Sequence, residues 1–393
     1  MFKIIGMTKL IWKLFKIVLT LLLAFLMYVV IGGVVPFLHH PDVSQTKKEA
    51  VESTQFYSDS AGPDRATIIE DNEEALKMRL RVIKDAKKTL ILSTFDFRSD
   101  DAGKDILAAL LNAADRGVKV EIFADGFNSI IQMENNDYFY ALSSNKNIKI
   151  IIYNQVNILI PWNGLGRMHD KYVIADDSLY ILGGRNTFGY FLGDYAGHKN
   201  YDRDVLVYNT GSKASSIYQI KDYYKKITSQ KCCSVFHCNE SLGEKNSVKK
   251  AEQELKNRYE SLENKYDKFL AENYDYKANT YETNKINLLS NPTSLYAKQP
   301  TVYYGLMYLA KNAKKEVKIH TPYIICNDYM YNELKNIKVP TTIMTNSAEN
   351  NGNIFGAVDY LNHKKDIINT GVTIKEYEGG ISYHGKSMTI DDD

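Results

Sequence analysis

Two short stretches of the sequence carry the same set of chemically useful side chains. MHDKYVIADD (168–177) aligns without a gap with the end of the chain, YHGKSMTIDDD. Each copy has a histidine, a lysine and an aspartate at the same spacing: His169, Lys171 and Asp176, then His384, Lys386 and Asp391. One neutral imidazole can attack a phosphorus centre, while a second can protonate the leaving oxygen and then activate an incoming alcohol or water. Two ammonium groups would stabilise the phosphate oxygens. The pattern predicts phosphoryl-type transfer that requires no metal and no cofactor.

The residues around the first copy predict how these groups are presented. The apolar run YVIA indicates a β-strand, on which side chains alternate between two faces. Arg167, His169 and Lys171 would then project from one face toward an anion. Downstream, Gly183 and Gly184 permit a tight turn or a close backbone approach. Asn186 could then hydrogen-bond a phosphate oxygen, with an ordinary capped turn as the alternative.

A third histidine, His363, also precedes a lysine by two positions, so that spacing alone is a weak signal. His363 lies in GAVDYLNHKKDIINTG, which predicts a surface helix, and Thr370 stands where the aspartate would be. We interpret His363 as part of a solvated basic face.

The elements that must position the two copies repeat in the same order. Periodicity in the first half predicts a helix at 71–88, a strand at 89–97, a helix ending at Gly117, and strands at 118–126 and 147–154. The second half parallels it at 311–323, 339–347 and 371–379. Alternating strands and helices indicate an α/β fold. We therefore expect two related domains in tandem.

The N-terminal region predicts a membrane anchor. After a basic segment at 1–16, residues 17–38 carry no charge and are long enough to cross a hydrocarbon core of roughly 30 Å. A cleaved signal peptide is the alternative, but the apolar run is longer than usual and no A-x-A-like site follows it. Lysines precede the span, which favours a single-pass cell-membrane protein with a cytoplasmic N-terminus and an extracytoplasmic body.

The remaining boundaries follow from composition. We expect a polar linker at 39–66, a first domain at 67–232, a charged helical linker at 233–296 and a second domain at 297–393. The charged helix is interpreted as a solvated linking helix, with a partner-binding helix as the alternative. The first half continues past Asp176 through a strand and a helix near 217–227, whereas two residues follow Asp391. We therefore expect the second domain to be incomplete.

Charge and cysteine content narrow the function. The net charge is +2, and residues 1–38 hold four lysines and no acid, so the rest sums to 2 − 4 = −2. A slightly acidic body is a poor footprint for nucleic acid, so we expect no nucleic-acid partner. Cys232, Cys233 and Cys238 lack the spacing of a zinc ribbon. A local disulfide or free thiols are the alternatives to a metal.

The doubled HDKYVIAD and HGKSMTID resemble the signature of the phospholipase D superfamily, and the N-terminal span is similar to that of bacterial cardiolipin synthases and phospholipase D-like membrane proteins. GGRN, AADRGVKVEIFADG, TPY and TNS also match, and the resemblance covers roughly residues 67–393. It implies two α-β-α sandwich domains related by pseudo-twofold symmetry. It also implies a phosphohistidine on His169, with His384 as general acid and base. Lys171, Lys386 and Asn186 would bind phosphate, and Asp176 and Asp391 would orient the motif.

The resemblance implies a phosphatidyltransferase or phosphodiesterase that acts on glycerophospholipids in a membrane. Two alternatives remain, a catalytically silent protein that binds lipid or a partner, and a phosphodiesterase of the nuclease type. Transfer to an alcohol and hydrolysis begin from the same covalent intermediate, so sequence does not separate them. The lipid headgroup and the oligomeric state leave no signature in the sequence.

Overall fold

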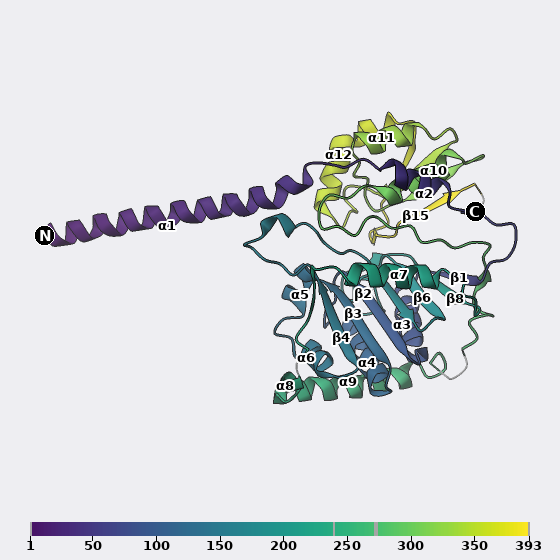
Figure 1. Cartoon of the computed structure of the whole chain (residues 1–393), viewed down its shortest axis with the longest axis horizontal. Coiled ribbons are helices and arrows are strands. Elements are labelled where there is room, and N and C mark those ends of the chain that lie inside the picture. Colours follow the sequence, from purple (N-terminus) through teal and green to yellow (C-terminus); the bar gives the residue numbers. More distant parts are fainter. Residues whose placement is uncertain (1, 239, 271–273, 392–393) are drawn as a thin grey trace.

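The computed structural model describes residues 2–238, 240–270 and 274–391. Two α/β domains lie one above the other in Figure 1, and a long helix, α1 (Phe2–Val34), projects from the side of the body between them. The fold class is confirmed: each domain has a sheet with helices packed against it.

The first domain is built on a mixed sheet of nine strands. Their spatial order is β10 (Tyr281–Glu282), β1 (Asp64–Ile69), β8 (Asp204–Asn209), β6 (Leu179–Gly183), β5 (Tyr172–Ala175), β2 (Thr89–Thr94), β3 (Lys119–Asp125), β4 (Ile148–Tyr153) and β9 (Cys233–Val235). Strands β2, β3 and β4 run parallel, whereas β5 pairs antiparallel with β2.

Alternate side chains along the strands of the first sheet pack into two separate hydrophobic cores, one on each face. Leu90 and Leu92 on β2 pack with helices on one face, whereas Ile91 packs with the other face. The first face is covered by α3 (Asn72–Asp85), α4 (Asp101–Asp115) and α6 (Asp137–Ser144), with α9 (Asn246–Lys265) packed on the outside of α4 and α6, and the second face by α7 (Ile217–Thr228). Helix α4 ends as predicted, because Gly117 has φ +93°. The result is the predicted α-β-α sandwich.

The second domain repeats the centre of the first. Its four-stranded sheet has the order β13 (Thr373–Tyr377), β12 (Thr341–Asn346), β11 (Val317–His320) and β15 (Ser387–Ile390). Three strands are parallel and β15 is antiparallel, which is the arrangement of β4, β3, β2 and β5. Helices α10 (Thr301–Lys311), α11 (Asp328–Lys335) and α12 (Ile354–Ile368) pack around it. Here β15 is the edge strand, whereas in the first sheet β6, β8 and β1 continue beyond β5.

Helix α1 is apolar and lies outside the body. Within the described residues, Leu10–Phe37 is the one helical stretch long and apolar enough to cross a membrane, and none of its most apolar window is buried. It ends in a short 3-10 turn, η1 (Val35–Phe37). The predicted uncharged span began at residue 17, whereas α1 begins at Phe2 and therefore also contains Lys13 and Lys16.

Both predicted linkers turn out to be structured. In the segment 39–66, α2 (Gln45–Glu52) packs on α10 of the second domain through Val51 and Tyr304, and β1 begins at Asp64. In the segment 233–296, β9 and β10 extend the first sheet. The expectation of a solvated α9 is wrong, because a buried stripe packs it on α4 and α6: Val248, Ala251, Leu255, Tyr259 and Leu262. These residues recur every three or four positions, so the helix is amphipathic despite its charge.

A small two-stranded ladder joins the domains. β7 (Asn200–Tyr201) of the first domain pairs in parallel with β14 (Ser382–Tyr383) of the second. The next backbone amide, of His384, donates to the carbonyl of Tyr201 at 2.6 Å. The ladder therefore holds the second H-x-K segment against the first domain.

Candidate active site

His169 and Lys171 lie in the extended segment immediately before β5. The prediction of a strand-borne histidine is wrong by a few residues, since β5 begins at Tyr172. Lys171 Nζ donates to the His169 carbonyl at 2.7 Å and lies 3.1 Å from His169 Nδ1. The His169 ring also packs on Phe95, with ring centroids 4.5 Å apart. With its proton on Nδ1, this ring would present the lone pair of Nε2 to a substrate.

His384 and Lys386 repeat this geometry before β15. Lys386 Nζ donates to the His384 carbonyl at 2.7 Å and lies 3.3 and 3.2 Å from the two nitrogens of the His384 ring. The ring meets Phe191 of the first domain edge-on at 5.1 Å. Each motif therefore folds its lysine back over its own histidine.

The charged groups of the two motifs act on one another. Desolvation, followed by the charges of Lys171, Lys386 and His384, lowers the pKa of His169 to about 3. Desolvation and the charge of Lys386 lower the pKa of Lys171 to about 7. Desolvation also lowers the pKa of Lys386 to about 8. His384 packs on Phe191 of the first domain, and Lys386 lies near enough to His169 and Lys171 to lower the pKa of both, so the two motifs lie close to each other.

His384 has a carboxylate partner from the other domain. Its Nδ1 lies 2.7 Å from Oδ2 of Asp202, which is buried. Burial alone would raise the pKa of Asp202, but the hydrogen bond and the charges of His384 and Lys386 hold it below its ordinary value. Burial lowers the pKa of His384, and the bond to Asp202 opposes that shift. A carboxylate acceptor at Nδ1 directs the free lone pair of the neutral ring to Nε2.

The glycine pair is required by Asp202 and Asp204. A Cβ on Gly184 would lie 2.3 and 2.6 Å from the two carboxylate oxygens of Asp202, and one on Gly183 would lie 1.9 Å from Oδ1 of Asp204. The predicted close backbone approach is therefore present. Asn186 follows this pair, is buried, and accepts the amide hydrogen of Asp96 through Oδ1 at 3.3 Å.

Arg185, between the glycines and Asn186, fixes this loop from inside. Its fully buried guanidinium donates to the Asp202 carbonyl at 2.6 Å, the Ile69 carbonyl at 3.1 Å and the Asp204 carboxylate at 3.1 Å. Because one side chain holds both the Asn186 loop and the Asp202 backbone, Arg185 sets the position of the groups beside His384.

Three residues that were predicted to lie near the substrate form hydrogen bonds within the protein instead. The Asp176 carboxylate accepts the amides of Lys87, Lys88 and Thr89, each at 2.8 Å, and the Asp391 carboxylate accepts those of Lys314, Lys315 and Glu316. Both aspartates lie at the far ends of β5 and β15, outside the site, which corrects their grouping with the catalytic residues. The Arg167 guanidinium is occupied by Asp125 at 3.3 Å and the Asn154 carbonyl at 2.7 Å.

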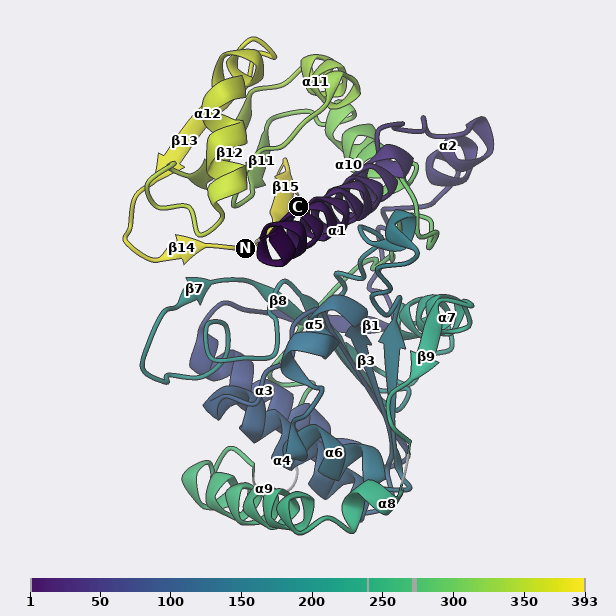
Figure 2. The same cartoon turned by 90° about the vertical axis from the view of Figure 1, so that its left-hand side faces the viewer.

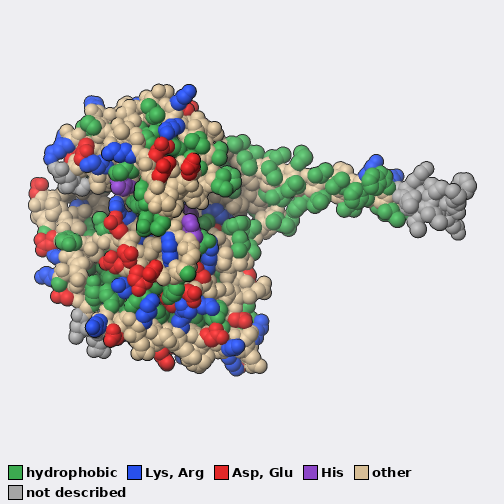
Figure 3. Space-filling model, turned by 180° about the vertical axis from the view of Figure 1, so that it is seen from behind, with side chains coloured by type: hydrophobic (Ala, Val, Ile, Leu, Met, Phe, Trp, Pro, Cys, Tyr) green, Lys and Arg blue, Asp and Glu red, His purple; other side chains and the backbone are tan. Residues whose placement is uncertain are grey.

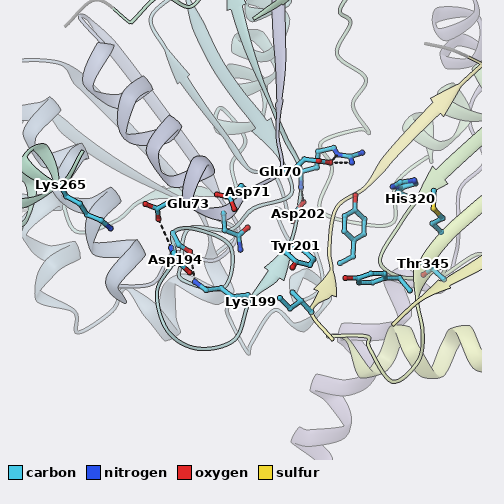
Figure 4. A pocket seen from close by; sticks show the side chains of 17 residues that line it. Glu70, Asp71, Glu73, Asp194, Lys199, Tyr201, Asp202, Lys265, His320 and Thr345 are labelled. Carbon is cyan, nitrogen blue, oxygen red and sulfur yellow. Dashed lines mark hydrogen bonds and ion pairs between the residues drawn. The ribbon is translucent and has the colours of Figure 1, made fainter. Parts of the chain in front are cut away.

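Two cavities each reach one of the motif histidines. One of about 400 Å³ is lined by His169, Lys171 and the segment 288–293, and one of about 470 Å³ by His384, Asn186 and the N-terminal end of α12. A larger cavity of about 1060 Å³ lies between the domains beside Asp202 (Figure 4). Neither motif histidine nor either motif lysine lines that larger cavity, so we place the chemistry in the two smaller ones.

His363 lies apart from both motifs, on α12, with its Nδ1 3.5 Å from Asp359, which agrees with its interpretation as a surface residue. In the described part of the chain, no three metal-ligating side chains are grouped to hold an ion, and all four cysteines are free.

Asp202 and Arg185 are the residues that the sequence reasoning missed. Both lie close to features that it noticed, the GGRN turn and the strand DVLVY. The charged triplet Asp202, Arg203 and Asp204 before an apolar strand is an unusual local pattern that could have marked a buried polar site. Its partner, however, is 182 positions away.

Comparison with known proteins identifies the class. Residues 80–227 match a family described as "Cardiolipin synthase, PLD-like domain". Phosphatidylserine synthase of Haemophilus influenzae Rd KW20 superposes with a TM-score of 0.56 at 13% identity, covering 88% of this chain and 80% of that one. Residues 80–227 are therefore a phospholipase D-like domain by sequence, and the fold of the chain as a whole is similar to that of the phosphatidylserine synthase.

Two relatives show how far sequence similarity extends. An uncharacterized protein of Helicobacter pylori (strain ATCC 700392 / 26695) is 26% identical over 367 residues, which are 83% of this chain and 70% of that protein. Cardiolipin synthase B of Salmonella typhi is 31% identical over 142 residues, which are 36% of this chain and 34% of the synthase. The match to the named synthase therefore spans about a third of each protein.

Proposed function

We propose that the chain is a membrane-anchored phosphatidyltransferase or phospholipase that acts on glycerophospholipids through a phosphohistidine intermediate. The observation that carries this proposal is that the second H-x-K element is held against the first domain, by the β7–β14 ladder and the bond from His384 to Asp202, near enough for Lys386 to act on His169. The names of the relatives, a cardiolipin synthase and a phosphatidylserine synthase, support a phosphatidyl group as the unit transferred.

The unequal surroundings of the two rings support different roles for them. His169 lies near two ammonium groups, and in the described chain Lys171 is the only hydrogen-bond partner of its ring. A ring kept neutral in this way suits a nucleophile. Burial lowers the pKa of His384, but its bond to the buried Asp202 carboxylate opposes that shift, and a ring that can both hold and release a proton suits a general acid and base.

The reaction then proceeds in two balanced steps. In the tautomer that carries the ring proton on Nδ1, the lone pair on His169 Nε2 forms a bond to phosphorus while the bond from phosphorus to the headgroup oxygen breaks, and His384 gives its proton to that oxygen. His384 next takes a proton from an alcohol or water, whose oxygen attacks phosphorus and breaks the bond to His169. Lys171, Lys386 and Asn186 hold the phosphate oxygens throughout, since their positive charge and amide offset the charge gathering there.

Trapping the intermediate tests this proposal. The full chain is reconstituted with phospholipid labelled in the phosphate, quenched with base, and examined for label on the protein. We expect His169→Ala to abolish the adduct and His363→Ala, the matched H-x-K control on α12, to retain it. An adduct that persists in His169→Ala would overturn the role of His169. Absence of any lipid product would overturn the proposed function.

A change of leaving group tests His384 separately. A p-nitrophenolate leaving group needs no proton, so His384→Ala should still release one equivalent of p-nitrophenol from a phosphatidyl ester. Turnover should then stop, because no base activates the second nucleophile. Full turnover by His384→Ala would exclude its proposed role.

The membrane placement is also part of the proposal. The exposed apolar α1 supports a single-pass anchor, and the lysines before it support an extracytoplasmic body. Cys238 is exposed on that body. A membrane-impermeant maleimide should label Cys238 in intact cells, and labelling only after lysis would reverse the orientation.

A further inference from the structure

Helix α1 leaves the body in a direction set by contacts with the first domain. Tyr28 Oη donates to the Leu159 carbonyl at 2.9 Å. Gly32 faces Pro161 so closely that a Cβ there would lie 2.7 Å from the proline ring. These contacts tie the end of the helix to the loop 154–166, which contains η2 (Pro161–Asn163). If α1 crosses a bilayer, the side of the body around this loop faces the membrane.

That side of the body is unusually apolar. Exposed large hydrophobic side chains lie on three segments: Phe127, Ile130 and Ile131 on α5 (Gly126–Gln132), Ile158, Leu159, Trp162 and Leu165 on the loop, and Ile354, Phe355, Val358 and Leu361 on α12. We name this set the apolar face. Figures 1 and 2 place α5 and α12 on the side from which α1 projects, and Figure 3 shows hydrophobic side chains along α1 and on the body beside its base.

The apolar face is also nearly free of charge. The segments 126–133, 154–166 and 350–358 contain no Asp, Glu, Lys or Arg, although a quarter of the whole chain (24%) is charged. Contiguous apolar surface of this kind marks a contact with protein or lipid. Because the face continues from the base of a helix that is itself apolar and exposed, lipid is the surface it fits.

The apolar face reaches the candidate active site. Ile354 and Phe355, which are 77% and 87% exposed, line the cavity that contains His384 and Asn186. A phosphate held in this cavity would therefore lie beside exposed apolar side chains that belong to the apolar face.

We propose that the apolar face lies in the headgroup region of the bilayer that holds α1, so that the His384 cavity opens directly onto the lipid. A phospholipid would place its phosphate between the two histidines while its acyl chains pass over Ile354 and Phe355 and remain in the membrane. The docking itself rests on α1 and the face, whereas its catalytic use rests on the function proposed above. Since the segments 126–133, 154–166 and 350–358 carry no charged side chain, docking is mainly apolar and high salt does not weaken it.

The chain offers its own depth probe. It contains two tryptophans, Trp12 in α1 and Trp162 in the apolar face, so Trp12→Phe leaves Trp162 as the single reporter. The full-length variant is reconstituted into phosphatidylcholine vesicles with nitroxide on the headgroup or high on the acyl chain. We expect nitroxide lipid to quench Trp162 emission at least about twofold, with little change in about 1 M salt. Quenching by aqueous iodide but not by nitroxide lipid would overturn the docking.

A paired substitution tests whether docking serves catalysis. Ile131→Ser with Leu361→Ser removes one exposed apolar side chain from each domain without touching either cavity. The docked protein would bury both side chains in the bilayer, so their loss should lower kcat/KM on vesicle phospholipid at least about tenfold. Hydrolysis of soluble bis(p-nitrophenyl) phosphate should be unchanged. The matched control is Ile68→Ser with Tyr281→Ser, which removes two side chains at least as exposed but on β1 and β10, and should retain both activities.

The outcomes separate the two proposals. Nitroxide quenching without turnover on any lipid supports the docking and overturns the proposed function. Turnover on vesicles with Trp162 in water supports the function and overturns the docking. Shielding of Trp162 from both iodide and nitroxide lipid would show that a protein covers the face, which also overturns the docking.

Discussion

Replacing Asp176 with asparagine separates a structural role from a catalytic one. Its carboxylate accepts the Lys88 and Thr89 amides through Oδ1 and the Lys87 amide through Oδ2. Asparagine keeps one acceptor oxygen, but its amide nitrogen would face the Lys87 N–H. Loss of a hydrogen bond to a charged group costs about 1.5–3 kcal/mol, and water partly replaces it at this exposed turn. We therefore expect a loss of about 2 kcal/mol in the free energy of unfolding.

The same substitution should leave the chemistry intact. A loss of about 2 kcal/mol in a domain of this size lowers Tm by roughly 4–8 °C. Lys171 and Asp176 flank opposite ends of β5, and five residues of extended chain span roughly 16 Å. A carboxylate at that distance cannot exchange a proton with substrate, so turnover by the folded variant should stay within about twofold.

The assay compares thermal unfolding and turnover of the full chain in detergent, with turnover measured well below Tm. Asp177→Asn is the matched control, because its half-exposed carboxylate pairs with Lys221 at the surface. Such surface pairs contribute about 0–1 kcal/mol, so its Tm should barely change. An Asp176→Asn protein with unchanged Tm and turnover reduced more than about 100-fold would refute the structural assignment.

Three further predictions concern the cleft. Asp202→Asn removes the charged acceptor at His384 Nδ1 and should slow transfer from alkyl phosphodiesters about 10- to 100-fold, with little effect on the first-turnover release of p-nitrophenol from p-nitrophenyl esters, as a leaving-group series would show. Gly184→Ala places a methyl group 2.3 Å from an Asp202 oxygen, so it should reproduce that leaving-group dependence and also lower Tm. Inorganic phosphate should bind most tightly below pH 7 and progressively less as pH rises through about 7 and 8, where Lys171 and Lys386 lose their charge. Titration calorimetry across this range measures the decline, and arginine at both positions should remove it because guanidinium stays charged.

Local periodicity accounts for most of what could be predicted from the sequence. The strands β2, β3, β4, β11, β12 and β13 and the helices between them follow hydrophobic patterns that depend on near neighbours only. The charged α9 was misjudged because its charge was weighed above its stripe, although Leu255 and Tyr259 already lay at helical spacing. Burial of that stripe depends on α4 and α6, which lie far upstream.

The sequence by itself determined the paired histidine and lysine motifs, the α/β alternation that presents them, and an apolar helix at the N-terminus. These are properties of residue type and spacing along the chain. Only the tertiary structure decided that Asp202 bonds to His384, that Asp176 and Asp391 bind backbone amides outside the site, and that α5, the loop 154–166 and α12 form one face. Each of these joins segments distant in sequence, and hydrogen bonds and burial depend on distance in space.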